Sequence, residues 1–143
     1  MKRLVRALAI SLILVLNLLT NAQTARTSNA DSTEVEATVR NYIEAYYTGD
    51  ARRMQQTLHP HYLKHMIHGD IPMREKTGAQ MLRDISSSSS IPAADKTEQI
   101  SVLDIAGNIA SAKLVTPHWV DYLTLAKSDG EWKILSVVQR IDD

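Results

Sequence analysis

The last third of the chain, residues 97–141, reads TEQISVLDIAGNIASAKLVTPHWVDYLTLAKSDGEWKILSVVQRI. Ile, Val, Leu, Thr and aromatic residues dominate this stretch, which is typical of β-strands. It is divided by Gly107-Asn108 and by Ser128-Asp129-Gly130, which are hairpin-forming turns. The pattern predicts four consecutive antiparallel strands, over residues 97–106, 109–116, 118–127 and 131–141.

A helical pattern precedes the strands. Thr33, followed three positions later by Glu36, has the form of a capping box, which marks the start of a helix. Apolar side chains then recur at the i, i+4, i+7 and i+11 spacing of one helical face, at Val35, Val39, Tyr42 and Tyr46. The spacing predicts a helix over residues 34–48.

Two residues separate this helix from a second one. Gly49 is placed to end the first helix in a left-handed conformation, and Asp50 can accept backbone N–H groups at the start of the next. We expect the second helix at about residues 51–58, with Pro60 as its stop. Residues 61–67 are ambiguous between a strand and a last helical turn, and a strand is favoured.

A third helix follows in the pattern. Thr77 and Gln80 repeat the capping-box spacing, and a short apolar stripe after them predicts a helix over residues 78–86. The serine run over residues 86–90, with Pro92, predicts a loop. Helices first and strands later is the order of an α+β domain, in which helices cover one face of a bent sheet.

The N-terminal segment has the features of an export signal. Lys2, Arg3 and Arg6 precede an apolar run over residues 7–19, and small residues follow it, including Ala22. We expect residues 1–22 to be a signal peptide that directs the protein to a secreted or periplasmic location, the alternative being an uncleaved membrane anchor. Residues 23–32 show no apolar period, and we expect a flexible leader there.

Composition narrows the possible functions. The 143 residues suit one domain, and Lys plus Arg equals Asp plus Glu at 16 each. The basic residues form no stripe that would neutralise a phosphate backbone, so nucleic acid is not an expected partner. The absence of cysteine excludes disulfides and thiolate chemistry. The aromatic residues are five Tyr and two Trp without any Phe, and most of them therefore carry a polar tip.

Five stretches together resemble one known family. They are VEATVRNYIE (residues 35–44), YTGD (47–50), LHP (58–60), VDYLTLAK (120–127) and DGEWKI (129–134). In this order and spacing they resemble the "putative lumazine-binding" family of the nuclear-transport-factor-2-like superfamily. That superfamily also holds ketosteroid isomerases, polyketide cyclases and many binding modules, so the fold alone does not select a function.

The resemblance covers residues 34–142 and carries several implications. It implies a cone-shaped α+β fold in residues 33–143, with N-terminal helices packed on a strongly curved antiparallel sheet. It implies a small-molecule site in the mouth of the cone, for a pteridine-like ring by the family's name. It also implies a homodimer formed through the outer face of the sheet.

Tyr42 and Asp121 are the candidates for chemistry that the resemblance suggests. In the similar ketosteroid isomerases a tyrosine seven residues before the Gly-Asp turn donates a hydrogen bond to a developing oxyanion, and Tyr42 stands seven residues before Gly49. Asp121 falls close to where the second acid would lie. The carboxylate base is absent, because residues 64–66 read Lys-His-Met, and His65 would have to replace it. The alternative is that Tyr42 is a core tyrosine with a satisfied hydroxyl.

The histidines provide no recognisable metal signature. His59, His61, His65 and His68 lie within ten residues, but no cysteine or clustered carboxylate completes their spacing. We therefore expect no metal. A histidine side chain can accept a proton near neutral pH, so His65 and His118 are candidate proton acceptors.

Strand alternation places the remaining candidates. Asp121 alternates with Leu123 and Leu125, which favours an inward carboxylate. For Trp119 two interpretations fit equally well: a side chain in the core, or a ring on which a flat ligand stacks. Trp132 is expected in the core, on the face that it would share with Ile134, Ser136 and Val138.

Three functions fit this sequence. The first is an exported, non-catalytic domain that binds a small, partly aromatic or apolar molecule through Tyr42, Tyr46, His65, Trp119 and Asp121, without a cofactor. The second is an isomerase-, cyclase- or dehydratase-type enzyme, with Tyr42 as oxyanion donor, His65 or His118 as base and Asp121 as acid. The third is a scaffold that binds another protein through its exposed sheet.

Overall fold

The computed structural model describes residues 29–87 and 96–141. The expected signal peptide and most of the expected leader lie outside these residues, as does the serine-rich loop beyond residue 87. The fold described below belongs to the compact unit that runs from Ser32 to Asp143. Among the described helices, none combines the length and the apolar character needed to cross a membrane.

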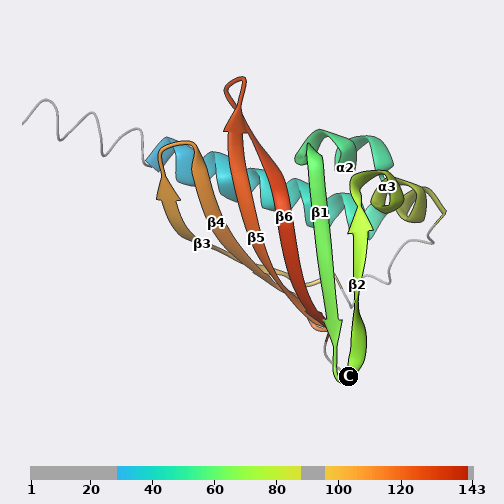
Figure 1. Cartoon of the computed structure of the whole chain (residues 1–143). Helices are drawn as coiled ribbons and strands as arrows, with labels where there is room; N and C mark the ends of the chain where they lie inside the picture. The colour runs from blue at the N-terminus through green and yellow to red at the C-terminus, as the bar shows by residue number, and fades with distance from the viewer. Residues whose placement is uncertain (1–28, 88–95, 142–143) are drawn as a thin grey trace, which may run out of the picture. The chain divides into compact units, whose positions relative to one another are not determined.

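A six-stranded sheet forms the body of this unit (Figure 1). Its order is β2-β1-β6-β5-β4-β3, so β2 and β3 remain as edges and the curved sheet does not close. The strands are β1 (Leu58–His68), β2 (Ile71–Thr77), β3 (Gln99–Ala106), β4 (Ile109–Val115), β5 (Trp119–Ser128) and β6 (Glu131–Ile141).

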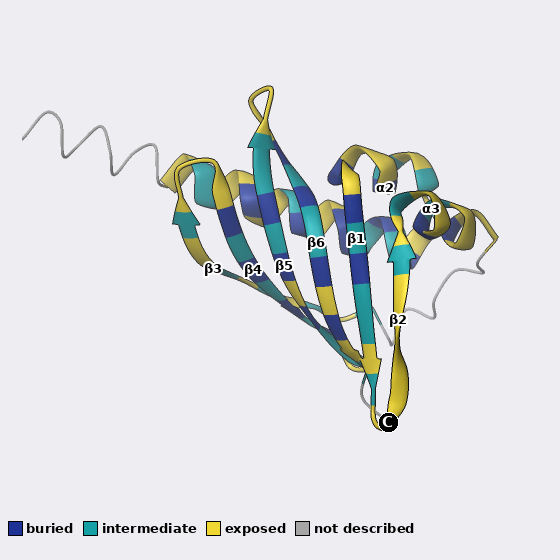
Figure 2. Ribbon diagram, viewed as in Figure 1, coloured by how far each residue is buried: buried dark blue, intermediate teal, exposed yellow. Residues whose placement is uncertain are grey.

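Three helices accompany the sheet. The first covers residues 29–48 and runs across one face of the strands, while α2 (Ala51–Thr57) and α3 (Gly78–Ser87) lie near β1 and β2 (Figure 1). The buried bands of the strands in Figure 2 belong to the same core as the first helix. That helix contributes Val35, Val39, Tyr42, Ile43, Ala45 and Tyr47.

Most expected elements are confirmed. The four C-terminal strands and both of their turns are present, residues 61–67 belong to β1, and α3 begins at Gly78, directly after Thr77 of the capping box. Gly49 has a φ of 72°, and Asp50 caps α2 by accepting a hydrogen bond from the Arg53 amide at 2.9 Å.

Three expectations about local structure are wrong. Pro60 lies within β1 and does not end α2. Residues 29–32 are helical and not an irregular leader, so Thr33 lies inside the first helix and does not cap it. Packing of the apolar stripe that begins at Val35 anchors this helix, and polar residues can extend an anchored helix without an apolar period. Strand β2 was not expected at all, because its side chains are almost all exposed and show no alternation.

The sheet is also not antiparallel throughout. Strands β1 and β6 pair in parallel, with Lys64 opposite Val137 and His65 opposite Val138. Hairpin signals specify only strands that are neighbours along the chain. Strands β1 and β6 are far apart in the sequence, so no turn motif predicts that they pair.

A bulge in β6 changes which of its side chains face inward. Ile134 pairs with Leu125 and Ser136 pairs with Thr124, so Leu135 has no partner on β5. Beyond it the alternation shifts by one residue: Val137 is fully buried, whereas Val138 is 45% exposed. Trp132 is buried as expected, but the expected inward face through Ser136 and Val138 is wrong.

Candidate functional site

A cavity of about 190 Å³ lies between the first helix and the sheet. Its walls come from the first helix, from β1, β2, β5 and β6, and from α3. The residues that line it are Tyr42, Ile43, Tyr46, Lys64, Met66, Lys76, Met81, Trp119, Asp121, Gln139 and Ile141. Four of the five expected ligand-binding residues are thus brought together: Tyr42, Tyr46, Trp119 and Asp121.

A buried pair of opposite charges forms the polar part of this cavity. Lys64 Nζ lies 3.4 Å from Asp121 Oδ1, and their side chains are 6% and 0% exposed. Asp121 points inward together with Leu123 and Leu125, as alternation predicts. Gln139 lies between the two strands concerned, as the register partner of Asp121 on one side and of Met66 on the other.

Two tyrosine hydroxyls extend the pair into a network. Lys64 Nζ donates a hydrogen bond to the Tyr42 hydroxyl at 3.1 Å, and that hydroxyl lies 3.5 Å from the hydroxyl of Tyr62. Burial raises the pKa of both phenols, so both remain protonated at neutral pH. Tyr42 is therefore a core residue whose hydroxyl also contacts the charged pair.

Burial pushes the two charged groups toward their neutral forms. It raises the pKa of the Asp121 carboxyl, and the nearby Lys64, Trp119 and Gln139 side chains oppose that rise. It lowers the pKa of the Lys64 ammonium, against the attraction of Asp121 and with additional repulsion from Lys76. Burial therefore favours a neutral amine beside a neutral carboxyl group, and the attraction between the charged forms opposes it; buried groups with shifted pKa values are common at acid–base sites.

Some polar atoms of the cavity have no partner. Among the described residues, neither carboxylate oxygen of Asp121 nor Trp119 Nε1 has a hydrogen-bond partner in good geometry, and all three atoms are buried. Buried polar atoms are rarely left in this condition, because each loses its hydration without replacement. A molecule in the cavity that donates N–H or O–H groups to Asp121 would replace the hydrogen bonds to water that the carboxylate loses on burial.

Aromatic rings form another part of the wall. The ring centroids of Tyr46 and Trp119 are 5.4 Å apart with an interplanar angle of 76°, which is a T-shaped contact. Met66, Met81 and Ile141 add apolar surface. The cavity therefore combines a charged polar cluster with an apolar and aromatic lining, a combination common in small-molecule sites.

The two candidate histidine bases lie elsewhere. Lys64 and Met66 face the cavity, so alternation along β1 turns His65 to the other face, where its Nε2 lies 3.2 Å from Glu75 Oε1 on β2. His118 is exposed in the bend between β4 and β5. Neither lines the cavity, so the structure does not bring either histidine together with Tyr42 and Asp121 as the expected catalytic set requires, nor His65 together with the other expected ligand contacts.

Lys64 is the residue that sequence reasoning missed. In the sequence it stands out only as a position without a carboxylate, although the alternation of Tyr62, Lys64 and Met66 signals a lysine on the buried face of β1. Among the described residues, no group of three or more histidine, aspartate or glutamate side chains gathers as metal ligands would.

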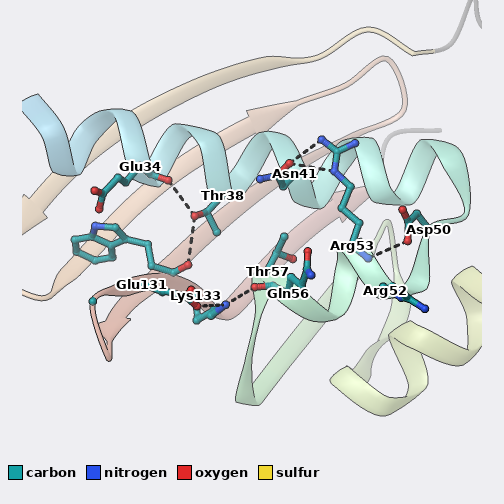
Figure 3. A pocket seen from close by; sticks show the side chains of 12 residues that line it. Glu34, Thr38, Asn41, Asp50, Arg52, Arg53, Gln56, Thr57, Glu131 and Lys133 are labelled. Carbon is teal, nitrogen blue, oxygen red and sulfur yellow. Dashed lines mark hydrogen bonds and ion pairs between the residues drawn. The ribbon is translucent and has the colours of Figure 1, made fainter.

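A larger hollow of about 790 Å³ lies between the first helix, α2 and the β5–β6 turn (Figure 3). It is open and polar, and many of its groups already bind one another. Arg53 donates to Asn41 at 2.7 and 3.0 Å, Thr38 donates to the Trp132 carbonyl at 3.3 Å, and Lys133 contacts Glu131 at 2.7 Å. This mutual pairing makes the smaller, buried cavity the better candidate site.

A curved, open sheet with a helix across one face and a small buried cavity between them defines the nuclear-transport-factor-2-like class of α+β domains. The chain belongs to the family described as "Putative lumazine-binding", whose model matches residues 30–139. No curated protein matches the chain significantly.

Solved structures of the same class are similar over four fifths of the chain. A protein of unknown function from Shewanella baltica OS155 has 16% identity and a TM-score of 0.67, covering 80% of this chain and 95% of its own. One from Methylobacillus flagellatus KT has 20% identity and a TM-score of 0.66, covering 80% and 94%. A ketosteroid isomerase-like protein from Erwinia carotovora atroseptica SCRI1043 has 13% identity and a TM-score of 0.61, covering 80% and 98%. At these identities the likeness establishes the fold alone.

Proposed function

We propose that this chain is an exported domain that binds a small, partly aromatic molecule in the cavity beside Asp121. The observation that carries the proposal is the fully buried Asp121 carboxylate, which lines the cavity and contacts Lys64 Nζ at 3.4 Å but accepts no well-formed hydrogen bond from the described residues. A ligand with N–H or O–H groups on one edge would bind Asp121 with that edge and place its apolar part against Met66 and Met81.

The size of the cavity limits the ligand. Its volume of about 190 Å³ is below the roughly 300 Å³ at which drug-sized pockets begin. A ring system of one or two rings fits this space better than three or four rings. The family description supports a pteridine-like molecule, in which ring nitrogens carry the N–H groups that Asp121 requires.

Thermal unfolding in the presence of candidate rings tests this proposal. Lumazine has two rings, a flavin three and a steroid four. We expect lumazine-sized molecules to raise the melting temperature and the larger rings to have little effect. A ligand present at about one hundred times its Kd stabilises by about 2.7 kcal/mol. Failure of every ring, at concentrations up to its solubility, would contradict the proposal.

Tryptophan fluorescence provides a second readout. The chain has two tryptophans, so Trp132→Phe leaves Trp119, in the cavity wall, as the only one. We expect ligand-dependent quenching in this variant. Trp119→Phe keeps a ring against Tyr46 but removes the indole N–H, and it should weaken binding of any ligand that accepts a hydrogen bond there.

Export and dimerisation are further parts of the proposal. Residues 1–22 support export by their charged, apolar and small-residue regions, which N-terminal sequencing of the protein recovered from the periplasm or medium would test. Tyr122 and Val138 support a homodimer through the outer sheet face. They are register partners, and they are 53% and 45% exposed on the face opposite the cavity.

A further inference from the structure

We propose that Lys64 Nζ is a nucleophile that captures small aldehydes or ketones in this cavity as an imine. The inference rests on the proposed function in one respect, because it requires that a small molecule can enter the cavity. It adds a covalent activity and a chemical class of ligand that non-covalent ring binding does not include.

The position of the amine carries the proposal. Lys64 lines the cavity with a side chain that is only 6% exposed, between the Tyr42 hydroxyl at 3.1 Å and Asp121 Oδ1 at 3.4 Å. Lys76, the other lysine of the lining, forms an ion pair with Asp84 at 2.6 Å. Lys64 is therefore the amine that a carbonyl compound in the cavity would meet beside both a phenol and a carboxyl group.

The surroundings also favour the reactive form of the amine. Only neutral amine attacks carbonyl carbon, and desolvation is one way in which proteins produce it. The groups around Nζ come from four elements: Tyr42 from the first helix, Tyr62 from β1, Lys76 from β2 and Asp121 from β5. Burial and Lys76 lower the pKa of Lys64, and Asp121 opposes them.

The pair supplies the proton transfers that the reaction needs. The lone pair of Nζ forms the C–N bond while the C=O π electrons move to oxygen. The oxygen gains a proton from the Asp121 carboxyl, the nitrogen returns one to the carboxylate, and a neutral carbinolamine results. A second cycle removes the hydroxyl as water and the remaining N–H proton, which leaves the imine. The sum is amine plus carbonyl compound giving imine plus water, and Asp121 ends as it began.

Reductive trapping tests the proposal on the full chain. Benzaldehyde and sodium cyanoborohydride are added at about pH 7, and the benzyl group on each lysine is followed with time by peptide mass spectrometry. The neutral fraction of an amine increases as its pKa falls. We expect Lys64 to be labelled several-fold faster than Lys113 or Lys133. Equal or slower labelling of Lys64 overturns the proposal.

Two variants sharpen the result. Lys64→Arg keeps a cation but has no nucleophilic amine, so the fast phase should disappear while the other lysines react as before. Tyr42→Phe removes the phenol beside Nζ and should slow labelling of Lys64 several-fold; an unchanged rate would remove Tyr42 from the site. If Lys64→Arg does not fold, the labelling pattern of the unmodified chain still decides.

The experiment separates this inference from the proposed function. Fast labelling of Lys64 without stabilisation by any ring would support covalent capture and contradict ring binding. Stabilisation by lumazine-sized rings without labelling of Lys64 would do the reverse.

Discussion

Lys64 Nζ and Asp121 Oδ1 lie 3.4 Å apart although their strands, β1 and β5, are not neighbours. Strand β6 lies between them, and the two side chains meet over its inner face beside Gln139. A contact that reaches over a strand requires long side chains and an inward-curving sheet. The pair therefore depends on the curvature of the sheet as much as on the two residues.

Removing one charge of the Lys64–Asp121 pair should destabilise the protein more than removing both. Asp121→Leu leaves the Lys64 ammonium buried without its counter-ion, and removal of one partner from a buried pair costs about 3–5 kcal/mol. Lys64→Met/Asp121→Leu removes both charges and should recover most of that loss. Urea unfolding of the three proteins measures it. A double variant as unstable as Asp121→Leu would show that the charges are not coupled.

Stability should depend on pH through Lys64. Its pKa in the folded protein lies below the ordinary 10.5, so between these two values the unfolded chain binds more protons than the folded one. Burying the amine is therefore unfavourable below the lowered pKa, and stability rises as pH increases through the window. The stability of the wild type relative to the double variant should increase in urea titrations as the pH rises toward 10.5. A constant difference would contradict the lowered pKa.

His65 should be dispensable for the cavity. Its side chain lies on the other face of β1 with Glu75, so His65→Gln removes only a partly exposed contact with that carboxylate and should change stability by at most about 1 kcal/mol. Ring-induced stabilisation and the labelling rate of Lys64 should both stay at the wild-type level. Loss of either would return His65 to the set of site residues.

Tyr122 tests the outer face. Tyr122→Asp places a charge on the exposed apolar surface beside Val138 and should shift the protein toward the monomer in sedimentation equilibrium. Asp121 next to it points into the core, so ring binding should not change. A wild-type protein that is monomeric at high concentration would remove the dimer from the proposal.

The helices and strands that could be predicted are those whose sequence pattern lies within one short segment. Apolar periods and turn residues predicted the helices and four strands, and alternation correctly turned Asp121 inward. The exposed strand β2 carried no such signal. The bulge at Leu135 was also invisible to simple alternation, and it moved Val138 outward and Gln139 inward.

The site was only partly predictable for a related reason. Tyr42, Tyr46, Trp119 and Asp121 were named correctly as residues around one hollow. The position of Lys64 against Asp121 required the parallel pairing of β1 with β6, which brings residues far apart in the sequence together. The same pairing also determines which face of the sheet His65 occupies. Without knowledge of it, His65 was a more obvious candidate base than Lys64.

The strand order has a consequence for how the protein is made. Strand β6 is synthesised after the other five, yet it lies between the pair β2-β1 and the group β5-β4-β3. Until β6 is in place, the two parts share no strand pairing and the side of the cavity next to Lys64 is open. The cavity is therefore completed only when β6 joins the sheet, and a chain that has not yet inserted β6 cannot hold a ligand there.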